Sequence, residues 1–309
     1  MDIILTESNY TLLLIFLVYG CDNKIIITSD GMKELNLNIE YEVKKIKNKI
    51  LFAFYLLYLR IYFLKFNKKK YKRVIGSGHL IYSNLVIKNK EFIMFEDGFR
   101  NYGIKNQKGT NIQKLKSIFG YLSPKKEIIK AKKIYLTSFT KLYPGLKEKV
   151  EVININTLWQ KKSEHEKQKI LHIFGLDSKI SKKIYEKKYL LLTQPLSEDN
   201  ILSEEEKIEI YRKILKNYNQ SKVIIKPHPR EKTDYKIFFP DVGIIEKKVP
   251  IELLELCGFK IEEVITIFST GILNFKNKAK LSFYGTEINS KLFKKFGSMD
   301  HIIKRNKFI

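Results

Sequence analysis

A histidine between two prolines follows an apolar run, in the sequence Lys226-Pro227-His228-Pro229-Arg230. Proline fixes its own φ and has no N–H, so two prolines would hold the imidazole in a defined position after the run. Imidazole titrates near neutral pH and can donate to a leaving oxygen. With Lys226 and Arg230 beside it, His228 suits a phosphate, although a structural turn with an exposed histidine has the same pattern.

Small hydroxyl residues follow a second apolar run, in Thr266-Ile267-Phe268-Ser269-Thr270-Gly271. If a strand feeds a helix here, the hydroxyls of Ser269 and Thr270 collect with free backbone N–H groups at a helix N-terminus. Such a position binds anions through the N–H groups and the helix dipole. A plain helix N-cap explains the same residues equally well.

Two acidic turns complete the set of candidates. Glu96, Asp97 and Gly98 follow an apolar run, and adjacent carboxylates after a strand can provide a general base. Another run ends at Thr193 and leads through a polar loop to Asp199. Either turn, taken alone, is explained by an ordinary solvated loop.

Together the four turns predict a transfer from a nucleotide sugar. The histidine, the hydroxyls and the helix N-terminus would bind a nucleotide phosphate, while a carboxylate activates an acceptor hydroxyl. No Asp-x-Asp pair stands where a magnesium diphosphate needs one, and Glu96-Asp97-Gly98 is a poor metal clamp. The two cysteines and five histidines show no metal-ligand spacing either. We therefore expect a metal-independent reaction of a nucleoside monophosphate sugar.

Short apolar runs alternate with longer helical patterns, which predicts an α/β fold with parallel sheets covered by helices. The expected strands are Asp2–Leu5, Lys24–Thr28, Arg73–Ile75, Glu91–Phe95, Lys133–Leu136, Tyr189–Thr193, Lys222–Lys226, Glu263–Phe268 and Lys280–Tyr284. The expected helices are Asn9–Tyr19, Glu40–Phe66, Ser203–Tyr218 with a Ser203/Glu206 capping box, Ile251–Leu256 and one after Gly271. All four turns then lie at carboxyl ends of strands, where open α/β sheets bind their ligands.

The length of 309 residues predicts two domains. We expect a Rossmann-like domain at 1–160, a polar helical connection at 161–187 and a second Rossmann-like domain at 188–309. The economical arrangement of two such domains is face to face across a cleft, with the donor nucleotide on the second domain and the acceptor on the first.

The composition excludes several classes of protein. With 44% hydrophobic residues, the chain is not expected to be disordered. The 58 Lys+Arg against 33 Asp+Glu give a net charge of +25, which suits phosphates, anionic lipids or acidic glycans. Most of the cations are lysines rather than the arginines that base recognition favours, so a basic nucleic-acid-binding protein is a weak alternative.

One apolar segment raises the question of a membrane. Ile50–Phe66 is interrupted by Arg60 and Lys65, is too short to span a bilayer, and leads directly into the basic run Asn67–Arg73. A buried helix with a charged exit is one interpretation. The other is an interfacial helix whose aromatic residues enter the headgroup region while lysines meet anionic lipid. We expect a soluble bacterial cytoplasmic protein without an N-terminal anchor, with a peripheral contact at the inner face of the membrane as the alternative.

The sequence resembles the bacterial sialyltransferases of glycosyltransferase family 52 over nearly its whole length. The segments that carry the resemblance are Lys226–Arg230, Glu96–Gly98, Pro250-Ile251-Glu252, Phe268–Gly271 and the strand Lys133–Ser138. The resemblance implies a GT-B fold and a metal-independent, inverting transfer of sialic acid from CMP-sialic acid to a galactose hydroxyl. The glycan would belong to lipooligosaccharide or capsule, no cofactor would be needed, and a homodimer is a further expectation.

The resemblance also implies roles for single residues. His228 matches the general acid at the CMP phosphate, Glu252 the carboxylate that holds the ribose hydroxyls, and Ser269 and Thr270 the phosphate-binding hydroxyls. The remaining residues expected on the donor side are Thr193, Lys226, Pro229, Arg230 and Gly271, and those on the acceptor side are Glu96 and Gly98.

The general base has two candidates. Asp199 matches approximately a family aspartate in that role, with extra residues between it and Pro195. Asp97 matches the acidic motif that bacterial sialyltransferases share more widely. A GT-B glycosyltransferase with another donor or acceptor is the alternative to sialyl transfer, since related capsule transferases share these motifs.

Overall fold

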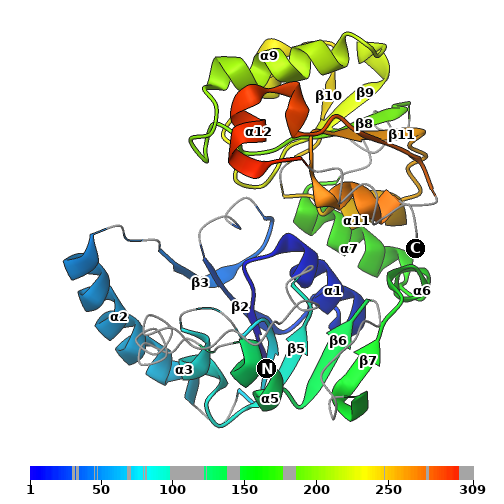
Figure 1. Ribbon diagram of the computed structural model, residues 1–309. Helices are drawn as coiled ribbons and strands as arrows, with labels where there is room; N and C mark the ends of the chain where they lie inside the picture. The colour runs from blue at the N-terminus through cyan, green and yellow to red at the C-terminus, as the bar shows by residue number, and fades with distance from the viewer. Residues whose placement is uncertain are drawn as a thin grey trace. The chain divides into compact units, whose positions relative to one another are not determined.

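The computed structural model describes the chain except residues 30–31, 33–34, 45, 47, 68–70, 79, 81, 98–121, 123, 138–146, 177–185, 247, 276–277 and 299–309. The chain forms two compact units, Met1–Phe174 and Gly175–Ile309, each built around a parallel sheet (Figure 1). The boundary between them falls inside the segment 161–187 that we expected to be a connection. The second helix of that neighbourhood, Glu164–Phe174, belongs to the first unit.

The first unit contains a seven-stranded sheet in the order β3-β2-β1-β4-β5-β6-β7. Its strands are β1 (Asp2–Leu5), β2 (Lys24–Ser29), β3 (Ile39–Val43), β4 (Arg73–Gly76), β5 (Glu91–Phe95), β6 (Lys133–Leu136) and β7 (Val150–Val152). Its α-helices are α1 (Asn9–Tyr19), α2 (Lys49–Phe63), α3 (Ser83–Ile87), α5 (Pro124–Lys130), α6 (Ile155–Gln160) and α7 (Glu164–Phe174), with 3-10 turns η1 (Leu64–Asn67) and η3 (Lys147–Lys149).

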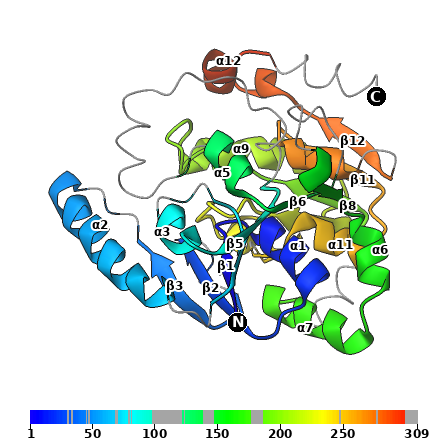
Figure 2. The same ribbon diagram turned by 90° about the horizontal axis from the view of Figure 1, so that it is seen from below.

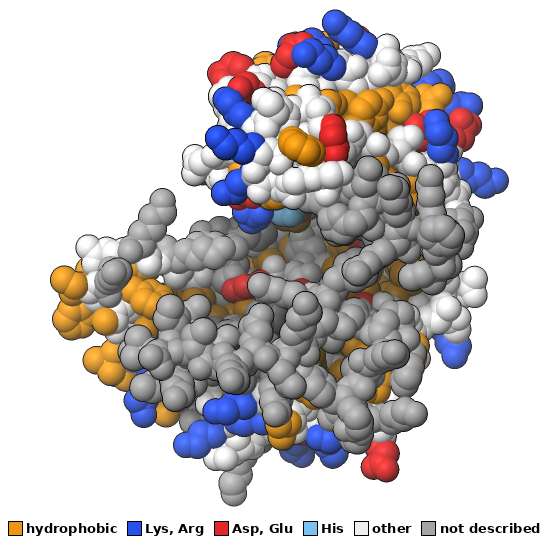
Figure 3. Space-filling view, in the orientation of Figure 1, with side chains coloured by type: hydrophobic (Ala, Val, Ile, Leu, Met, Phe, Trp, Pro, Cys, Tyr) orange, Lys and Arg blue, Asp and Glu red, His pale blue; other side chains and the backbone are white. Residues whose placement is uncertain are grey.

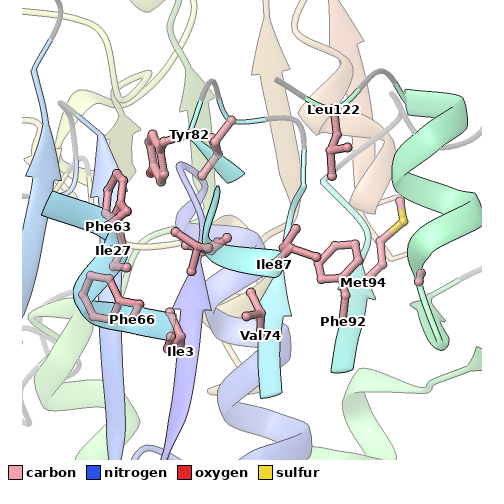
Figure 4. Close-up of a cluster of buried hydrophobic side chains, with 14 of the residues drawn as sticks. Ile3, Ile27, Phe63, Phe66, Val74, Tyr82, Ile87, Phe92, Met94 and Leu122 are labelled. Carbon is pink, nitrogen blue, oxygen red and sulfur yellow. The ribbon is translucent and has the colours of Figure 1, made fainter. Parts of the chain in front are cut away.

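The core of this unit follows from the alternation of side chains along buried strands. Ile3, Val74 and Phe92 point to one face, where they pack with side chains of α2, α3 and α5 (Figure 4). Phe63 of α2 reaches this layer and stacks on Tyr82 with ring centroids 5.1 Å apart. Helices α1 and α6 lie side by side in both ribbon views (Figures 1 and 2). The sheet is therefore buried on both faces, as a parallel sheet requires.

The expected helix Glu40–Phe66 is wrong in its first part. Residues Ile39–Val43 form strand β3, which pairs in parallel with β2, so these residues belong to the sheet and precede the helix. The helix starts after Asn48, whose side chain accepts hydrogen bonds from the backbone N–H groups of Ile50 and Leu51. Propensity alone did not separate the strand from the helix, because the strand has only five residues and continues through a lysine-rich segment into the apolar helix.

The second unit contains a five-stranded sheet in the order β10-β9-β8-β11-β12. Its strands are β8 (Tyr189–Leu192), β9 (Val223–Lys226), β10 (Gly243–Ile244), β11 (Glu263–Thr266) and β12 (Lys280–Phe283). Its helices are α9 (Glu204–Leu215), α10 (Tyr235–Phe238), α11 (Ile251–Leu256) and α12 (Ser290–Phe296), with 3-10 turns η4 (Gln220–Lys222), η5 (Thr270–Phe275) and η6 (Thr286–Ile288).

Two predictions of helix ends can be checked in this unit. The capping box is confirmed: Ser203 accepts from the backbone of Glu206, whose side chain accepts from the Ser203 backbone. The helix expected after Gly271 is instead the six-residue 3-10 turn η5. A turn of this length provides fewer aligned N–H groups than an α-helix, so the anion site expected there has a weaker dipole.

Candidate functional site

Three loops of the second unit meet at the carboxyl edge of its sheet. Strand β8 has β9 on one side and β11 on the other, and the chain order reverses direction at β8. In doubly wound sheets ligands bind at such a reversal, beyond the carboxyl ends of the strands. The loops after β8, β9 and β11 carry Thr193, His228 and Ser269, respectively, so the topology brings together three of the predicted donor-side positions.

Hydrogen bonds join the carboxyl end of β8 to the ends of β9 and β11. The backbone N–H of Thr193 donates to the carbonyl of Lys226 at 3.4 Å, and the hydroxyl of Thr266 donates to the carbonyl of Leu192 at 3.0 Å. The Gln194 side chain then accepts from the backbone N–H of Phe268 at 3.2 Å. The loops after β8 and β11 are thereby joined just beyond the sheet.

A buried glutamate organises the histidine loop. Glu231 is 2% exposed and accepts from the backbone N–H of His228 at 3.1 Å. It also accepts from the hydroxyls of Thr193 at 2.8 Å and Tyr235 at 2.5 Å. Burial raises the pKa of Glu231, and the three donors oppose that rise. The loop after β9 is therefore fixed to the end of β8 through one carboxylate.

The imidazole of His228 is half-buried and lies among cations. Its Nδ1 accepts from the backbone N–H of Arg230 at 3.2 Å, so the neutral ring carries its proton on Nε2. Burial, with the nearby charges of Arg230 and Lys226, lowers the pKa of His228 to about 4. An anion bound beside the ring would raise this pKa, because an opposite charge favours imidazolium. The site is thus a neutral Nε2–H donor in a cationic setting.

Asp199 forms an ion pair with the same loop. Both of its oxygens accept from the guanidinium of Arg230, Oδ1 from Nη1 at 2.5 Å and Oδ2 from Nη2 at 3.0 Å. Such a bidentate pair orients the carboxylate and uses one lone pair of each oxygen. A substrate hydroxyl that approaches Asp199 meets the remaining lone pairs, beside the guanidinium of Arg230.

The turn after β11 is compact. Ser269 is half-buried; its backbone N–H donates to Thr266 Oγ1 at 3.0 Å, and its hydroxyl accepts from the backbone N–H of Gly271 at 3.3 Å. The Ser269 hydroxyl keeps its own proton for donation to a ligand. The backbone of Thr270 belongs to η5, while its side chain lies outside what the structure describes.

The other donor-side positions lie on neighbouring segments. Lys226 is 7% exposed and donates from Nζ to the carbonyl of Pro227 at 2.8 Å. Pro229 is exposed within the histidine loop. Glu252 is half-buried in the first turn of α11, which follows β10 at the same edge of the sheet.

The first unit places its two predicted acids differently. Glu96 is 2% exposed; it accepts from the backbone N–H of Thr137 at 2.8 Å, from the Thr137 hydroxyl at 2.5 Å and from the hydroxyl of Tyr10. Asp97, the next residue, is half-buried, and its Oδ1 accepts from the Thr11 hydroxyl at 3.4 Å. Gly98 lies outside the described residues. Of the two carboxylates, Asp97 is the one that solvent can reach.

The family model for glycosyltransferase family 52 matches residues 9–292, which includes every loop described above. The chain belongs to glycosyltransferase family 52. It is also 42% identical over 260 residues to an uncharacterized protein of Haemophilus influenzae, covering 84% of this chain and 81% of that protein.

Solved structures with low sequence identity share the fold. A Photobacterium sp. JT-ISH-224 2,6-sialyltransferase, solved with CMP and lactose, has a TM-score of 0.59 at 12% identity and covers 91% of this chain and 71% of its own. An α/β-galactoside α-2,3-sialyltransferase of Photobacterium phosphoreum has a TM-score of 0.55 at 14% identity, covering 99% and 96%. A Methanocaldococcus jannaschii UDP-GlcNAc 2-epimerase has a TM-score of 0.52 at 15% identity, covering 96% and 92%. The predicted GT-B fold with two Rossmann-like units is confirmed.

Sequence reasoning missed two buried charged residues, Glu231 and Lys207, that hold the loops of the candidate site. In the sequence, Glu231 looks like a solvated acid in a charged loop. Its hydrogen bonds from Thr193 and from the His228 backbone show that it joins the loops after β8 and β9. Lys207 of α9 is fully buried and donates to Ser197 at 2.7 Å and Thr233 at 2.5 Å. It also pairs with Glu204 at 3.0 Å and Glu198 at 3.3 Å. A lysine among the apolar positions of α9 was the one available signal.

Within the described part of the chain, no group of three or more His, Cys, Asp or Glu side chains could hold a metal ion. The helices that the structure describes also include none with the length and apolarity needed to cross a bilayer.

Proposed function

We propose that this glycosyltransferase transfers sialic acid from CMP-sialic acid to a galactose hydroxyl of a lipooligosaccharide or capsule glycan, with inversion and without a metal ion. The observation that carries the proposal is the loop Lys226–Arg230, fixed at the reversal point of the second sheet beside Thr193 and Ser269. The Photobacterium sialyltransferase that shares the fold was solved with CMP and lactose, which supports the choice of donor and acceptor.

The cationic loop suits a monophosphate donor. Cleavage of CMP-sialic acid leaves one phosphate group on CMP, and Lys226, Arg230 and the Nε2–H of His228 can stabilise its developing charge. The donor's own carboxylate is a second anion, which favours the same cationic setting. Both anionic groups of the donor therefore match the cationic side chains at this edge.

The reaction is a single displacement at the anomeric carbon of sialic acid. The acceptor oxygen forms a bond to that carbon while the bond to the CMP phosphate breaks on the opposite side, which inverts the configuration. The proton of the acceptor hydroxyl passes to a carboxylate, either Asp97 or Asp199. The neutral ring of His228 donates a hydrogen bond from Nε2 to the departing phosphate oxygen; where the bound phosphate raises the pKa of His228 and the ring is imidazolium, it donates the proton instead and is left neutral.

The experiment is a transfer assay with the purified full chain. CMP-sialic acid and lactose are incubated with the protein in EDTA, and sialyl-lactose is detected by mass spectrometry; UDP-galactose and UDP-GlcNAc serve as competing donors. We expect sialyl-lactose in the presence of EDTA and no transfer from the UDP-sugars. Transfer only from a UDP-sugar would favour the second candidate function, a family 52 enzyme of other specificity. The shared fold with an epimerase solved with UDP-GlcNAc and UDP is the observation that favours this candidate.

A further inference from the structure

Helix α9 carries a lysine on the side that packs in the core of the second unit. Ile210, Tyr211 and Ile214 of this helix are buried in that core. Lys207 lies three residues before Ile210 and four before Tyr211, so it belongs to the same stripe, and its side chain is 0% exposed. On the visible surface of this unit, by contrast, Lys and Arg side chains lie beside Asp and Glu side chains (Figure 3). Core packing would be satisfied by an apolar residue at position 207 and does not explain a lysine there.

The ammonium group of Lys207 is surrounded by acceptors from three segments. Its Nζ donates to Ser197 Oγ at 2.7 Å and to Thr233 Oγ1 at 2.5 Å. The carboxylates of Glu204 and Glu198 lie 3.0 Å and 3.3 Å away. The first and last of these four partners along the chain belong to different loops, one after β8 and one after β9. We call Lys207 and these four partners the lysine network.

The lysine network is charged and internally satisfied. Glu204 accepts from the hydroxyls of Ser197 at 2.5 Å and Thr233 at 2.6 Å. Burial opposes the ionisation of Glu198 and Glu204, but hydrogen bonds and the charge of Lys207 lower the pKa of both below its usual value. Buried charges of this kind add little stability over apolar side chains, because they lose their hydration. What a satisfied network supplies is one defined arrangement of the segments that it joins.

The two loops joined by the network carry the ion pair of the candidate site. Glu198 Oε1 also accepts from the backbone N–H of Lys232 at 2.6 Å, which joins the loops a second time. Asp199 follows Glu198 directly, and Arg230 stands two residues before Lys232. The side chains of Asp199 and Arg230 are 36% and 59% exposed, and an exposed ion pair by itself holds two loops together weakly. The buried contacts of their neighbours therefore set the relative position of this pair.

We infer that Lys207 is a positioning residue for the phosphate of the donor. It holds the loop of Asp199 against the loop of Arg230, and so keeps the guanidinium in place beside His228 at the anion-binding edge. Because Lys207 is buried, it acts through Glu198 and the other members of the network and not by contact with the substrate. The inference rests on the proposed function, since it takes the phosphate of CMP-sialic acid as the bound anion.

The variant that tests this role must keep the protein stable. Lys207→Met/Glu198→Gln/Glu204→Gln removes the three charges together and keeps side chains of similar size. Uncharged replacements of a complete buried ion group are often neutral for stability, so we expect a Tm close to that of the wild type. If Lys207 contributed to stability alone, this triple variant would bind CMP as the wild type does.

The decisive measurement compares CMP with cytidine, which lacks the phosphate. Isothermal titration should give a Kd for CMP about tenfold to a hundredfold higher in the triple variant, because displacements of about 1 Å at a binding group have effects of this size. NMR titration with cytidine should give the same affinity for both proteins. Wild-type CMP affinity in the folded triple variant, or equal losses for CMP and cytidine, would overturn the inference.

Two further variants serve as control and as substitute. Glu263→Gln/Lys280→Met removes an ion pair with an N–O distance of 3.2 Å at the opposite, amino edge of the same sheet, and should bind CMP like the wild type. Thr233→Val deletes one hydroxyl partner of Lys207 and is used if the triple variant does not fold. It should raise the Kd for CMP about threefold to tenfold. Wild-type affinity in Thr233→Val would then contradict the role of Lys207.

Hydrogen exchange separates this inference from the proposed function, because it needs no ligand. The backbone N–H groups of Asp199, which donates to the carbonyl of Pro195 at 2.9 Å, and of Lys232 should exchange about tenfold faster or more in the triple variant. A wild type that binds no CMP and transfers no sialic acid refutes the assignment of the donor. Unchanged exchange at these two N–H groups refutes the role of Lys207 and leaves the assignment of the donor standing.

Discussion

In each of the two units a buried glutamate fixes the turn that follows a strand, but the side chains next to the glutamate differ. Glu231 and Glu96 are both 2% exposed, and each accepts one backbone N–H, one threonine hydroxyl and one tyrosine hydroxyl. Beside Glu231 stand an imidazole, a lysine and an arginine; beside Glu96 stands the aspartate Asp97. We therefore expect the edge beside Glu231 to bind an anion and the edge beside Glu96 to accept a proton.

The comparison shows how to separate structural from chemical carboxylates. A glutamate that is buried and accepts three hydrogen bonds is shielded from a substrate, so its contribution is to position its neighbours. We expect the neighbour that solvent can reach to do the chemistry: His228 in one unit and, if Asp97 rather than Asp199 is the base, Asp97 in the other.

The largest effect is expected at His228. His228→Ala removes the donor at the departing phosphate, and should lower kcat for sialyl transfer on the order of 10²–10⁴-fold. His228→Gln, which keeps a hydrogen-bond donor, should retain part of the activity. Initial rates with CMP-sialic acid and lactose measure both, and circular dichroism verifies folding. Wild-type turnover in His228→Ala would remove the histidine from the mechanism.

A loss of similar size is expected for one of two aspartates. Asp97→Asn should reduce kcat roughly 10²–10⁴-fold if Asp97 is the general base. Asp199→Asn should then reduce it less, because the Asp199 carboxylate is bound on both oxygens by Arg230. Asp199→Asn would weaken the interaction with Arg230 and raise the KM for the donor. The reverse order of the two losses would assign the base to Asp199 and break the comparison between the units.

The two buried glutamates should behave alike in stability and differently in binding. Glu231→Gln and Glu96→Gln each place an amide N–H₂ where three donors converge, which should cost about 1–3 kcal/mol of unfolding free energy. Thermal melts measure that loss. Isothermal titration should show weakened CMP binding in Glu231→Gln alone, since only that carboxylate holds the His228 backbone. Equal CMP affinity in the two variants would mean that the histidine loop does not need its anchor.

Much of the fold could be predicted because buried strands leave a local mark. The strands Asp2–Leu5, Glu91–Phe95 and Lys133–Leu136 are confirmed at both ends, since each is a short apolar run bounded by polar residues. Strand β3 was missed because its alternating Glu40–Val43 runs on into a lysine-rich segment and then an apolar helix. The two-residue strand β10 carries too few residues for any pattern.

The candidate site was predictable in part for the same reason. Loops that follow strands can be located from the strands, so the positions of Thr193, His228 and Ser269 at one edge follow from topology. The pairing of Asp199 with Arg230 and the burial of Glu231 could not be predicted, because both depend on contacts between residues 31 and 38 positions apart. Among adjacent acids such as Glu96 and Asp97, only tertiary structure decides which one is buried.

The smallest effect concerns the protonation of His228. Its pKa is lowered from 6.5 to about 4, so the unfolded chain binds this proton more readily than the folded one. The neutral ring therefore stabilises the fold above about pH 6.5, and this contribution, about 1–2 kcal/mol for a partly exposed ring, is lost as the pH falls towards 4. Thermal melts at pH 7.0 and 4.5 should show a larger loss of Tm for the wild type than for His228→Gln. The raised pKa of Glu231 acts in the opposite direction, but the wild type and His228→Gln share it, so its contribution cancels in the difference between their Tm losses.

Because bound CMP places a negative charge beside the ring, NMR titration should also find a higher pKa for His228 in the complex than in the free protein. An unchanged pKa would show that the phosphate binds away from the imidazole, and the cationic edge would then lose its assigned ligand.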